Sequence, residues 1–108
     1  MNEDRATVEI TDQNFYSLVQ SGLAVVEFWA VWSGPGRFLN PIVEQVASEY
    51  AGRVLVGRVD VDRNQQIPRQ FGVTSIPAIL FFRNGQLVDR LLGAVPKAAL
   101  KAKVDLLL

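Results

Sequence analysis

Trp29-Ala30-Val31-Trp32-Ser33-Gly34-Pro35-Gly36-Arg37 is the stretch of sequence on which the fold depends. An apolar run ends here, two tryptophans lie close together, and a Gly-Pro turn leads into a segment of helical periodicity. The stretch therefore predicts the end of a strand, a tight loop and the start of a helix over Gly36 to Tyr50. Ser33 is predicted to be the helix N-cap, because its short side chain can accept a hydrogen bond from the first turn.

The residues before this loop predict a buried central strand. Leu23 to Trp29 is nearly all apolar and rich in β-branched and aromatic side chains, as in a strand covered on both faces. Upstream, Ala6 to Ile10 predicts a short strand in which Val8 and Ile10 alternate with polar neighbours. A short helix is predicted over residues 13–20, with Phe15, Leu18 and Val19 on one face and either Thr11 or Asp12 as its cap.

The residues after the loop predict helices alternating with strands. The helix that follows it should bury Phe38, Ile42, Val43, Val46, Ala47 and Tyr50, end at Gly52 and kink at Pro41. Later elements are expected at Arg53 to Asp62 (strand), Arg63 to Phe71 (short helix), Ile76 to Arg83 and Gln86 to Leu92 (a hairpin with a type I′ turn at Asn84-Gly85), and a last helix that begins with Pro96 and buries Leu100, Val104 and Leu107. This order predicts a single α/β domain over residues 1–108, with a mixed sheet of about five strands flanked by about four helices.

The composition excludes several classes of function. Lysine plus arginine and aspartate plus glutamate number 11 each, so charge favours neither nucleic acid nor an anionic membrane. The chain has no cysteine and no histidine, which excludes disulfides, thiolate chemistry, zinc sites and Ser-His catalysis, and we expect no metal and no cofactor. Because Met1 to Arg5 is polar and no apolar run reaches ~18 residues, a cytoplasmic protein is predicted, and we expect it to be a monomer.

Several motifs together resemble the thioredoxin family over nearly the whole length of the chain. They are Glu27-Phe28-Trp29-Ala30, Trp32-Ser33-Gly34-Pro35-Gly36-Arg37, Pro41, Val59-Asp60-Val61-Asp62, Phe71-Gly72-Val73, Ser75-Ile76-Pro77, Phe82 to Gly85, and Gly93-Ala94. The resemblance implies a thioredoxin fold and a cis peptide bond before Pro77, facing the loop that carries Ser33.

The resemblance also implies an activity that this chain lacks the groups to perform. In thioredoxins the motif is Trp-Cys-Gly-Pro-Cys, in which the first thiolate attacks a disulfide and the second resolves the mixed disulfide. Ser33 stands at the attacking position and Gly36 at the resolving position. A serine hydroxyl is too weak an acid to replace the thiolate, and no histidine can act as its base. The chain as written is therefore not expected to be a dithiol–disulfide oxidoreductase.

Glu27 is the one charged residue of the predicted central strand. In the family an aspartate at this place assists proton transfer to the resolving thiol. Here the alternative is a structural role, in which Glu27 pairs with Arg58, at a family lysine position on the neighbouring strand, because a lone buried charge is costly. Trp29 is predicted to pack in the core beneath the loop.

A partner-binding surface is the functional interpretation that does not require the thiols. The positions that match the client surface of thioredoxins are Trp32, Gly34, Pro35, Ile76, Pro77, Gly93 and Ala94. Such a surface binds an extended peptide through backbone hydrogen bonds; the alternatives are an apolar patch without a partner and an anion site at the helix start beside Arg37. Leu106 to Leu108 is either a further partner site or the frayed end of the last helix.

Two functions follow from these observations. The first is a non-redox binding or scaffold protein for a polypeptide partner, which uses the surface of the Gly-Pro loop and the cis-proline. The second is a cysteine-free variant of an ordinary thioredoxin, whose parent is a protein-disulfide reductase in cell redox homeostasis.

Overall fold

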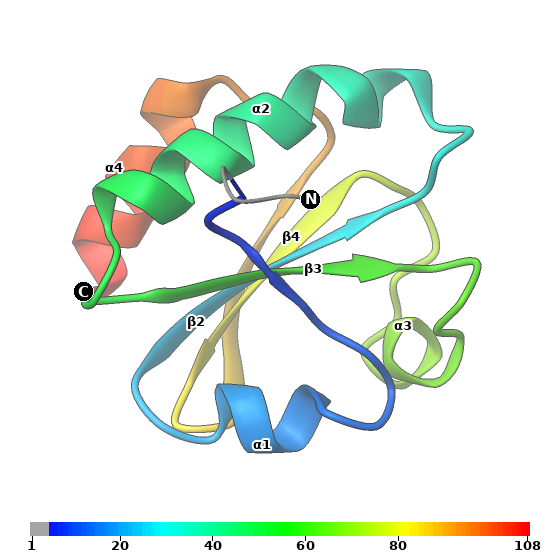
Figure 1. Cartoon of the computed structure of the whole chain (residues 1–108), viewed down its shortest axis with the longest axis horizontal. Helices are drawn as coiled ribbons and strands as arrows, with labels where there is room; N and C mark the ends of the chain where they lie inside the picture. The colour runs from blue at the N-terminus through cyan, green and yellow to red at the C-terminus, as the bar shows by residue number, and fades with distance from the viewer. Residues whose placement is uncertain (1–4) are drawn as a thin grey trace.

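A mixed five-stranded sheet, in the order β1-β3-β2-β4-β5, forms the centre of the protein, and the computed structural model describes residues 5–108 (Figure 1). The elements are β1 (Val8–Glu9), α1 (Phe15–Val19), β2 (Leu23–Trp29), α2 (Gly34–Glu49), β3 (Leu55–Asp60), α3 (Gln66–Gln70), β4 (Ala78–Arg83), β5 (Gln86–Leu92) and α4 (Lys97–Leu107). The expected α/β architecture is confirmed for the described part of the chain. No helix within residues 5–108 is both long and apolar enough to cross a membrane.

Strand β2 is the middle of the sheet, as its apolar sequence predicts. It pairs in parallel with β3 and antiparallel with β4. Its alternate side chains enter two separate cores, with Val25 on the side of α2 and α4 and Val26 on the other side with α1 and α3. Figure 1 shows these two layers, with α2 and α4 above the sheet and α1 and α3 below it.

The N-terminal strand departs from its prediction. β1 spans only Val8–Glu9, and Val8 is 39% exposed, whereas Thr7 and Ile10 are buried. The reason lies in β3, where a Cβ atom on Gly57 would come within 2.3 Å of Cδ1 of Ile10. Because this glycine has no side chain, Ile10 packs across it and Val8 is turned outward. Of the polar segment Met1 to Arg5, only Arg5 belongs to the described residues.

Helix α1 is shorter than predicted, and Thr11, one of the two expected caps, caps the turn that leads into it. The helix begins after Asn14, whose backbone N–H donates to Oγ1 of Thr11 at 3.1 Å, while the Asn14 side chain accepts from the Thr11 N–H at 2.7 Å. Asp12 caps α3 instead: its carboxylate accepts from the backbone N–H groups of Gln66 at 3.2 Å and Ile67 at 3.0 Å. This cap joins residues far apart in sequence.

Helix α2 begins at Gly34, two residues earlier than predicted, and continues through Pro41 to Glu49. The prediction that Phe38 is buried is wrong, because Phe38 is 77% exposed and the adjacent Leu39 is buried in its place. The buried face of α2 consists of positions 36, 39, 43, 46 and 47, which recur at three- and four-residue spacing, and Phe38 lies outside this face. Val43, Val46, Ala47 and Tyr50 are buried as expected.

The C-terminal half follows the predicted order with shorter elements. β3 and α3 lie within their predicted ranges, and β4 begins only after Pro77, which has no N–H to donate. Asn84 and Gly85 both have positive φ, 52° and 84°, as a type I′ turn requires. α4 begins one residue after Pro96 and buries Leu100 and Val104.

Candidate functional site

The loop between β2 and α2 is fixed by the Ser33 side chain and backbone. The Ser33 N–H donates to the carbonyl of Ala30 at 3.1 Å, and its Oγ accepts from the N–H of Gly36 at 3.3 Å. The predicted N-cap is therefore confirmed. Ser33 is only 4% exposed, so its hydroxyl lies beneath the loop surface rather than in front of it.

Gly36 lies directly against Ser33. A Cβ atom built on Gly36 would be 3.3 Å from Oγ of Ser33 and 3.5 Å from its Cβ. The missing side chain thus leaves room for the capping hydroxyl. These are the two positions that carry thiols in the thioredoxin family, which this sequence resembles. Ser33 has a hydroxyl that serves as a helix cap, and Gly36 has no side chain, so neither residue can exchange with a disulfide.

Beside this loop lies an apolar hollow of about 360 Å³, which we name the Trp32 groove. Its lining residues are Trp32, Val61, Pro68, Val73, Thr74, Ser75 and Ile76. The Trp32 ring is 66% exposed, and its Nε1–H donates to the carboxylate of Asp62 at 3.0 Å, which fixes the indole at one wall. The groove therefore has a rigid aromatic side and a floor from three other segments.

Two of the predicted surface residues, Trp32 and Ile76, meet in this groove, and the others lie around it. Gly34 and Pro35 are exposed at the start of α2, and Ala94 is exposed after β5. Gly93 is partly buried and donates its N–H to the carbonyl of Pro77 at 2.9 Å.

Pro77 differs from the other predicted surface residues because its side chain is buried. The expected cis bond between Ile76 and Pro77 is present. Sequence reasoning did not select Val61, Pro68, Val73 or Thr74 for the surface, although Val73 belongs to one of the motifs that indicate the family. They line the groove only because the β3–α3 and α3–β4 connections fold back toward Trp32.

The backbone of Ile76 is available for pairing. Within residues 5–108, neither its N–H nor its C=O takes part in a hydrogen bond. Ile76 precedes β4, so these groups lie outside the sheet ladder at the edge of the Trp32 groove. Backbone groups of this kind can hydrogen-bond to an extended peptide.

Glu27 lies beneath the site and forms the predicted pair with Arg58. Its side chain is fully buried, and Oε1 is 3.0 Å from Nε of Arg58. Burial raises the pKa of Glu27 to about 7, although the charge of Arg58 and its hydrogen bond act in the opposite direction. Oε2 of Glu27 has no hydrogen-bond partner among the described residues. The pairing prediction is thus confirmed.

The prediction that Trp29 packs in the core is wrong. It is only partly buried and belongs to neither core cluster. Its ring lies under the guanidinium of Arg58, with 4.4 Å from Cζ to the ring centroid, and faces a second hollow on the N-terminal side of the loop. The prediction that Trp29 packs in the core fails because its side of the sheet is left open between β1 and α2.

Comparison with known proteins agrees with this geometry. The Thioredoxin family model matches residues 6–106. A thioredoxin of Chlorobaculum thiosulfatiphilum is 41% identical over 99 residues, which cover 90% of this chain and 92% of the relative. Thioredoxin 2 of Chlorobaculum tepidum is 38% identical over 99 residues, covering 90% and 91%, and a thioredoxin of Staphylococcus haemolyticus is 39% identical over 100 residues, covering 93% and 96%.

Proposed function

Because this chain belongs to the thioredoxin family, we propose that it binds an extended segment of a polypeptide partner in the Trp32 groove and leaves the partner's disulfides unchanged. The observation that carries the proposal is the unpaired backbone of Ile76 beside an apolar hollow. An extended segment can hydrogen-bond to this backbone and place one apolar side chain in the hollow, as in strand addition.

The groove supplies the affinity that such a mode of binding needs. The exposed face of Trp32 is held in place by Asp62, so little side-chain freedom is lost when a partner packs against it. Removing the apolar surface of a bound Leu or Val side chain from water contributes about 1.5–3 kcal/mol. The binding is therefore of moderate strength and depends on one inserted side chain.

The chain itself has no group that can change a disulfide. It contains no cysteine, and the Ser33 hydroxyl is buried as a helix cap. Thiol–disulfide exchange requires a thiolate nucleophile. We therefore propose recognition or scaffolding rather than catalysis as the role of the domain.

Peptides selected on the immobilised protein from a random phage-displayed library test the proposal. The selected peptides are expected to carry an apolar residue and to shift the NMR signal of the Trp32 indole N–H. Ile76→Asp, which places a charge in the groove, is expected to weaken their binding at least tenfold. Leu106→Asp is the matched control, because Leu106 is 75% exposed on α4, on the other side of the molecule (Figure 1). Selected peptides that bind both variants equally would refute the proposal.

A second candidate is a cysteine-free variant of a protein-disulfide reductase. The distance of 3.5 Å between the Ser33 Cβ and a Cβ built on Gly36 favours it, because a disulfide joins Cβ atoms about 3.5–4.5 Å apart. The loop thus retains the spacing of a dithiol site. The native gene in the source organism separates the two candidates: cysteine codons at positions 33 and 36 support the cysteine-free variant, and codons for Ser33 and Gly36 support the binding role.

We further propose that the protein acts as a monomer in the cytoplasm. This proposal rests on the membership of the chain in the thioredoxin family. Fractionation of the source cells, followed by detection of the chain, is the direct measurement of its location.

A further inference from the structure

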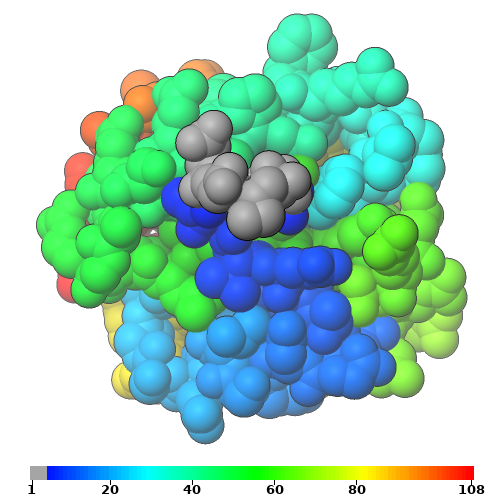
Figure 2. All heavy atoms as spheres, viewed as in Figure 1, coloured from blue at the N-terminus to red at the C-terminus, as the bar shows by residue number. Residues whose placement is uncertain are grey.

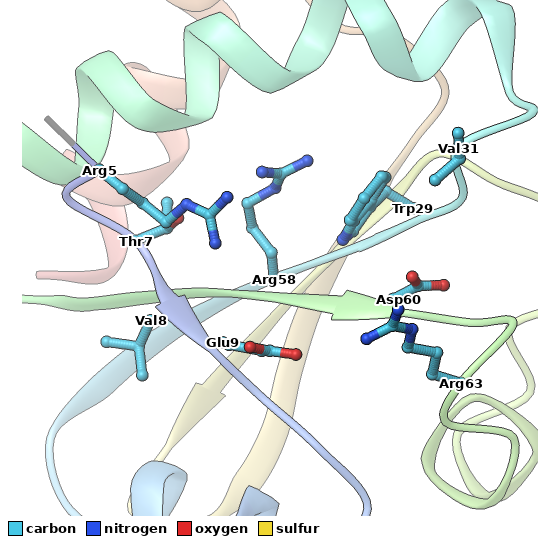
Figure 3. Close-up of a pocket in the computed structure, with 9 residues that line it drawn as sticks. All are labelled: Arg5, Thr7, Val8, Glu9, Trp29, Val31, Arg58, Asp60 and Arg63. Atoms are coloured by element: carbon cyan, nitrogen blue, oxygen red, sulfur yellow. The ribbon is translucent and has the colours of Figure 1, made fainter. Parts of the chain in front are cut away.

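The hollow in front of Trp29 is lined mainly by charged side chains. Its volume is about 290 Å³, and Figure 3 shows Arg5, Arg58 and Arg63 around it, each from a different segment of the chain. We name it the basic hollow. In Figure 2 the N-terminal segment, drawn in dark blue, crosses this face of the molecule between α2 and α1.

Arg58 is held in a fixed position and retains free donors. Its Nε donates to Glu27 at 3.0 Å, its guanidinium stacks on Trp29, and its side chain is only 12% exposed. Its Nη groups donate no hydrogen bond within residues 5–108, since the Glu44 carboxylate is 3.8 Å from Nη1. A preorganised guanidinium with free N–H groups is the geometry that binds a carboxylate in bidentate fashion.

Carboxylates line the hollow as well. Among the described lining residues, the guanidinium groups of Arg5, Arg58 and Arg63 face the carboxylates of Glu9 and Asp60. Oδ1 of Asp60 already accepts from the backbone N–H of Asp62 at 3.0 Å. Among the described residues, no carboxylate lies within 4.0 Å of the Arg63 guanidinium.

Glu27 and Glu44 lie behind Arg58 and partly neutralise it. Burial raises the pKa of Glu27 to about 7, so near neutral pH Glu27 is only partly ionised, and Glu44, whose partial burial is outweighed by hydrogen bonds that lower its pKa, supplies the larger share of this negative charge. A bound carboxylate is therefore held by the N–H donors of Arg58 rather than by a net positive charge.

The basic hollow and the Trp32 groove are neighbours along two segments. In the β2–α2 loop, Val31 lines the hollow and Trp32 lines the groove. After β3, Asp60 lines the hollow and Val61 lines the groove. A polypeptide segment bound in the groove therefore passes the hollow within a few residues, because an extended chain advances about 3.3 Å per residue.

We infer that the basic hollow binds the carboxylate of an Asp or Glu side chain of the polypeptide that occupies the Trp32 groove. This inference rests on the proposed function and specifies its partner: a segment with an apolar residue for the groove and, nearby, an acidic residue for the hollow. The Nη groups of Arg58 hold the carboxylate, and Arg5 and Arg63 add attraction that weakens as the ionic strength rises.

The only two tryptophans of the chain, one in each site, allow the two to be observed separately by NMR. N-acetyl-glutamate amide is expected to shift the indole N–H signal of Trp29 in a saturable manner, whereas the uncharged N-acetyl-glutamine amide is not. Arg58→Lys keeps a positive charge beside Glu27 but removes the free Nη donors, so it is expected to weaken this response at least fivefold. Arg53→Lys is the matched control, because Arg53 also stacks on an aromatic ring, that of Tyr50, away from the hollow.

Library-selected peptides provide the second part of the test. Those that contain Asp or Glu are expected to shift both indole signals, and their Gln analogues to bind at least fivefold more weakly and to shift only that of Trp32. Equal binding of acidic and neutral peptides at Trp32, with Trp29 unchanged, overturns the inference and leaves the proposed function standing. Peptides that do not bind at Trp32 refute the proposed function, and the inference about the partner's acidic residue is then refuted as well. The titration followed at Trp29 shows independently whether the basic hollow binds a carboxylate.

Discussion

At the scale of single residues, Glu27 and Arg58 form an ion pair beneath the site, with 3.0 Å between Oε1 of Glu27 and Nε of Arg58. A charge in a central strand needs a partner, and Arg58 lies on the adjacent strand. Arg58 also stacks on Trp29 and approaches Glu44. The pair is therefore part of a wider set of contacts in the space between β1 and α2.

The raised pKa of Glu27 makes the stability of the protein depend on pH. The folded state holds the Glu27 proton up to a pH of about 7, whereas the ordinary pKa of 4.5 applies when the chain is unfolded. The contribution of Glu27 to the free energy of unfolding is therefore fully present below pH 4.5 and falls, by on the order of 3 kcal/mol, as the pH rises to about 7.

Glu27→Gln is the test of this prediction. Urea unfolding followed at several pH values should give a smaller decline between pH 4.5 and 7 for the variant than for the wild-type chain. Glu9→Gln, at an exposed position, is the matched control and should keep the wild-type slope. Identical pH profiles for the wild-type chain and Glu27→Gln would show that Glu27 does not hold its proton in the folded state.

The spacing of Ser33 and Gly36 predicts that disulfide-reductase activity can be introduced by cysteine substitutions at these two positions. The double substitution Ser33→Cys and Gly36→Cys should form an intramolecular disulfide and reduce insulin with thioredoxin reductase, because the Cβ spacing already fits a disulfide. Ser33→Cys alone has no second thiol to resolve the mixed disulfide and should not turn over. A double variant that forms the disulfide but does not turn over would show that the surrounding surface no longer serves the reaction.

At the scale of elements, α3 is positioned by Asp12, which the sequence offered as one of two alternative caps for α1. Asp12 lies where a cap for α1 is expected, yet its carboxylate binds the first backbone N–H groups of α3. A capping residue can be recognised from sequence, but the helix that it caps depends on tertiary structure. The cap also matters for the Trp32 groove, because Pro68 of α3 forms part of the lining.

Removal of this cap should weaken the whole fold measurably. Asp12→Ala leaves the N–H groups of Gln66 and Ile67 without their acceptor and is expected to lower the free energy of unfolding by about 1 kcal/mol. Gln13→Ala, at the exposed neighbouring position, is the control and should change it little. Equal unfolding midpoints in urea for both variants would contradict the role of Asp12.

At the scale of the whole molecule, the order of elements was predictable and the sites were only partly so. The central strand and the hairpin follow from apolar runs and the Asn84-Gly85 turn, which act locally. The Trp32 groove and the basic hollow are each assembled from segments that are distant in sequence. The sequence predicted the Trp32 groove only in part, through the family resemblance, and it did not predict the basic hollow.

The oligomeric state is a property that the proposed function depends on. We expect the mass measured by light scattering after size-exclusion chromatography to be that of one chain, 12.0 kDa, over a wide range of concentration. A monomer leaves Trp32 and the groove open to a partner. A mass that doubles with concentration in the wild-type chain but not in Ile76→Asp would mean that a second copy occupies the groove.

The most direct test of the account is the affinity of a library-selected peptide for the wild-type chain, Ile76→Asp and Leu106→Asp, followed at the Trp32 indole N–H. We predict saturable binding to the wild-type chain and to Leu106→Asp, and at least tenfold weaker binding to Ile76→Asp, because Ile76 lines the groove and Leu106 does not. Equal affinity for all three proteins, or binding that leaves the Trp32 signal unmoved, would contradict the claim that this groove binds a polypeptide.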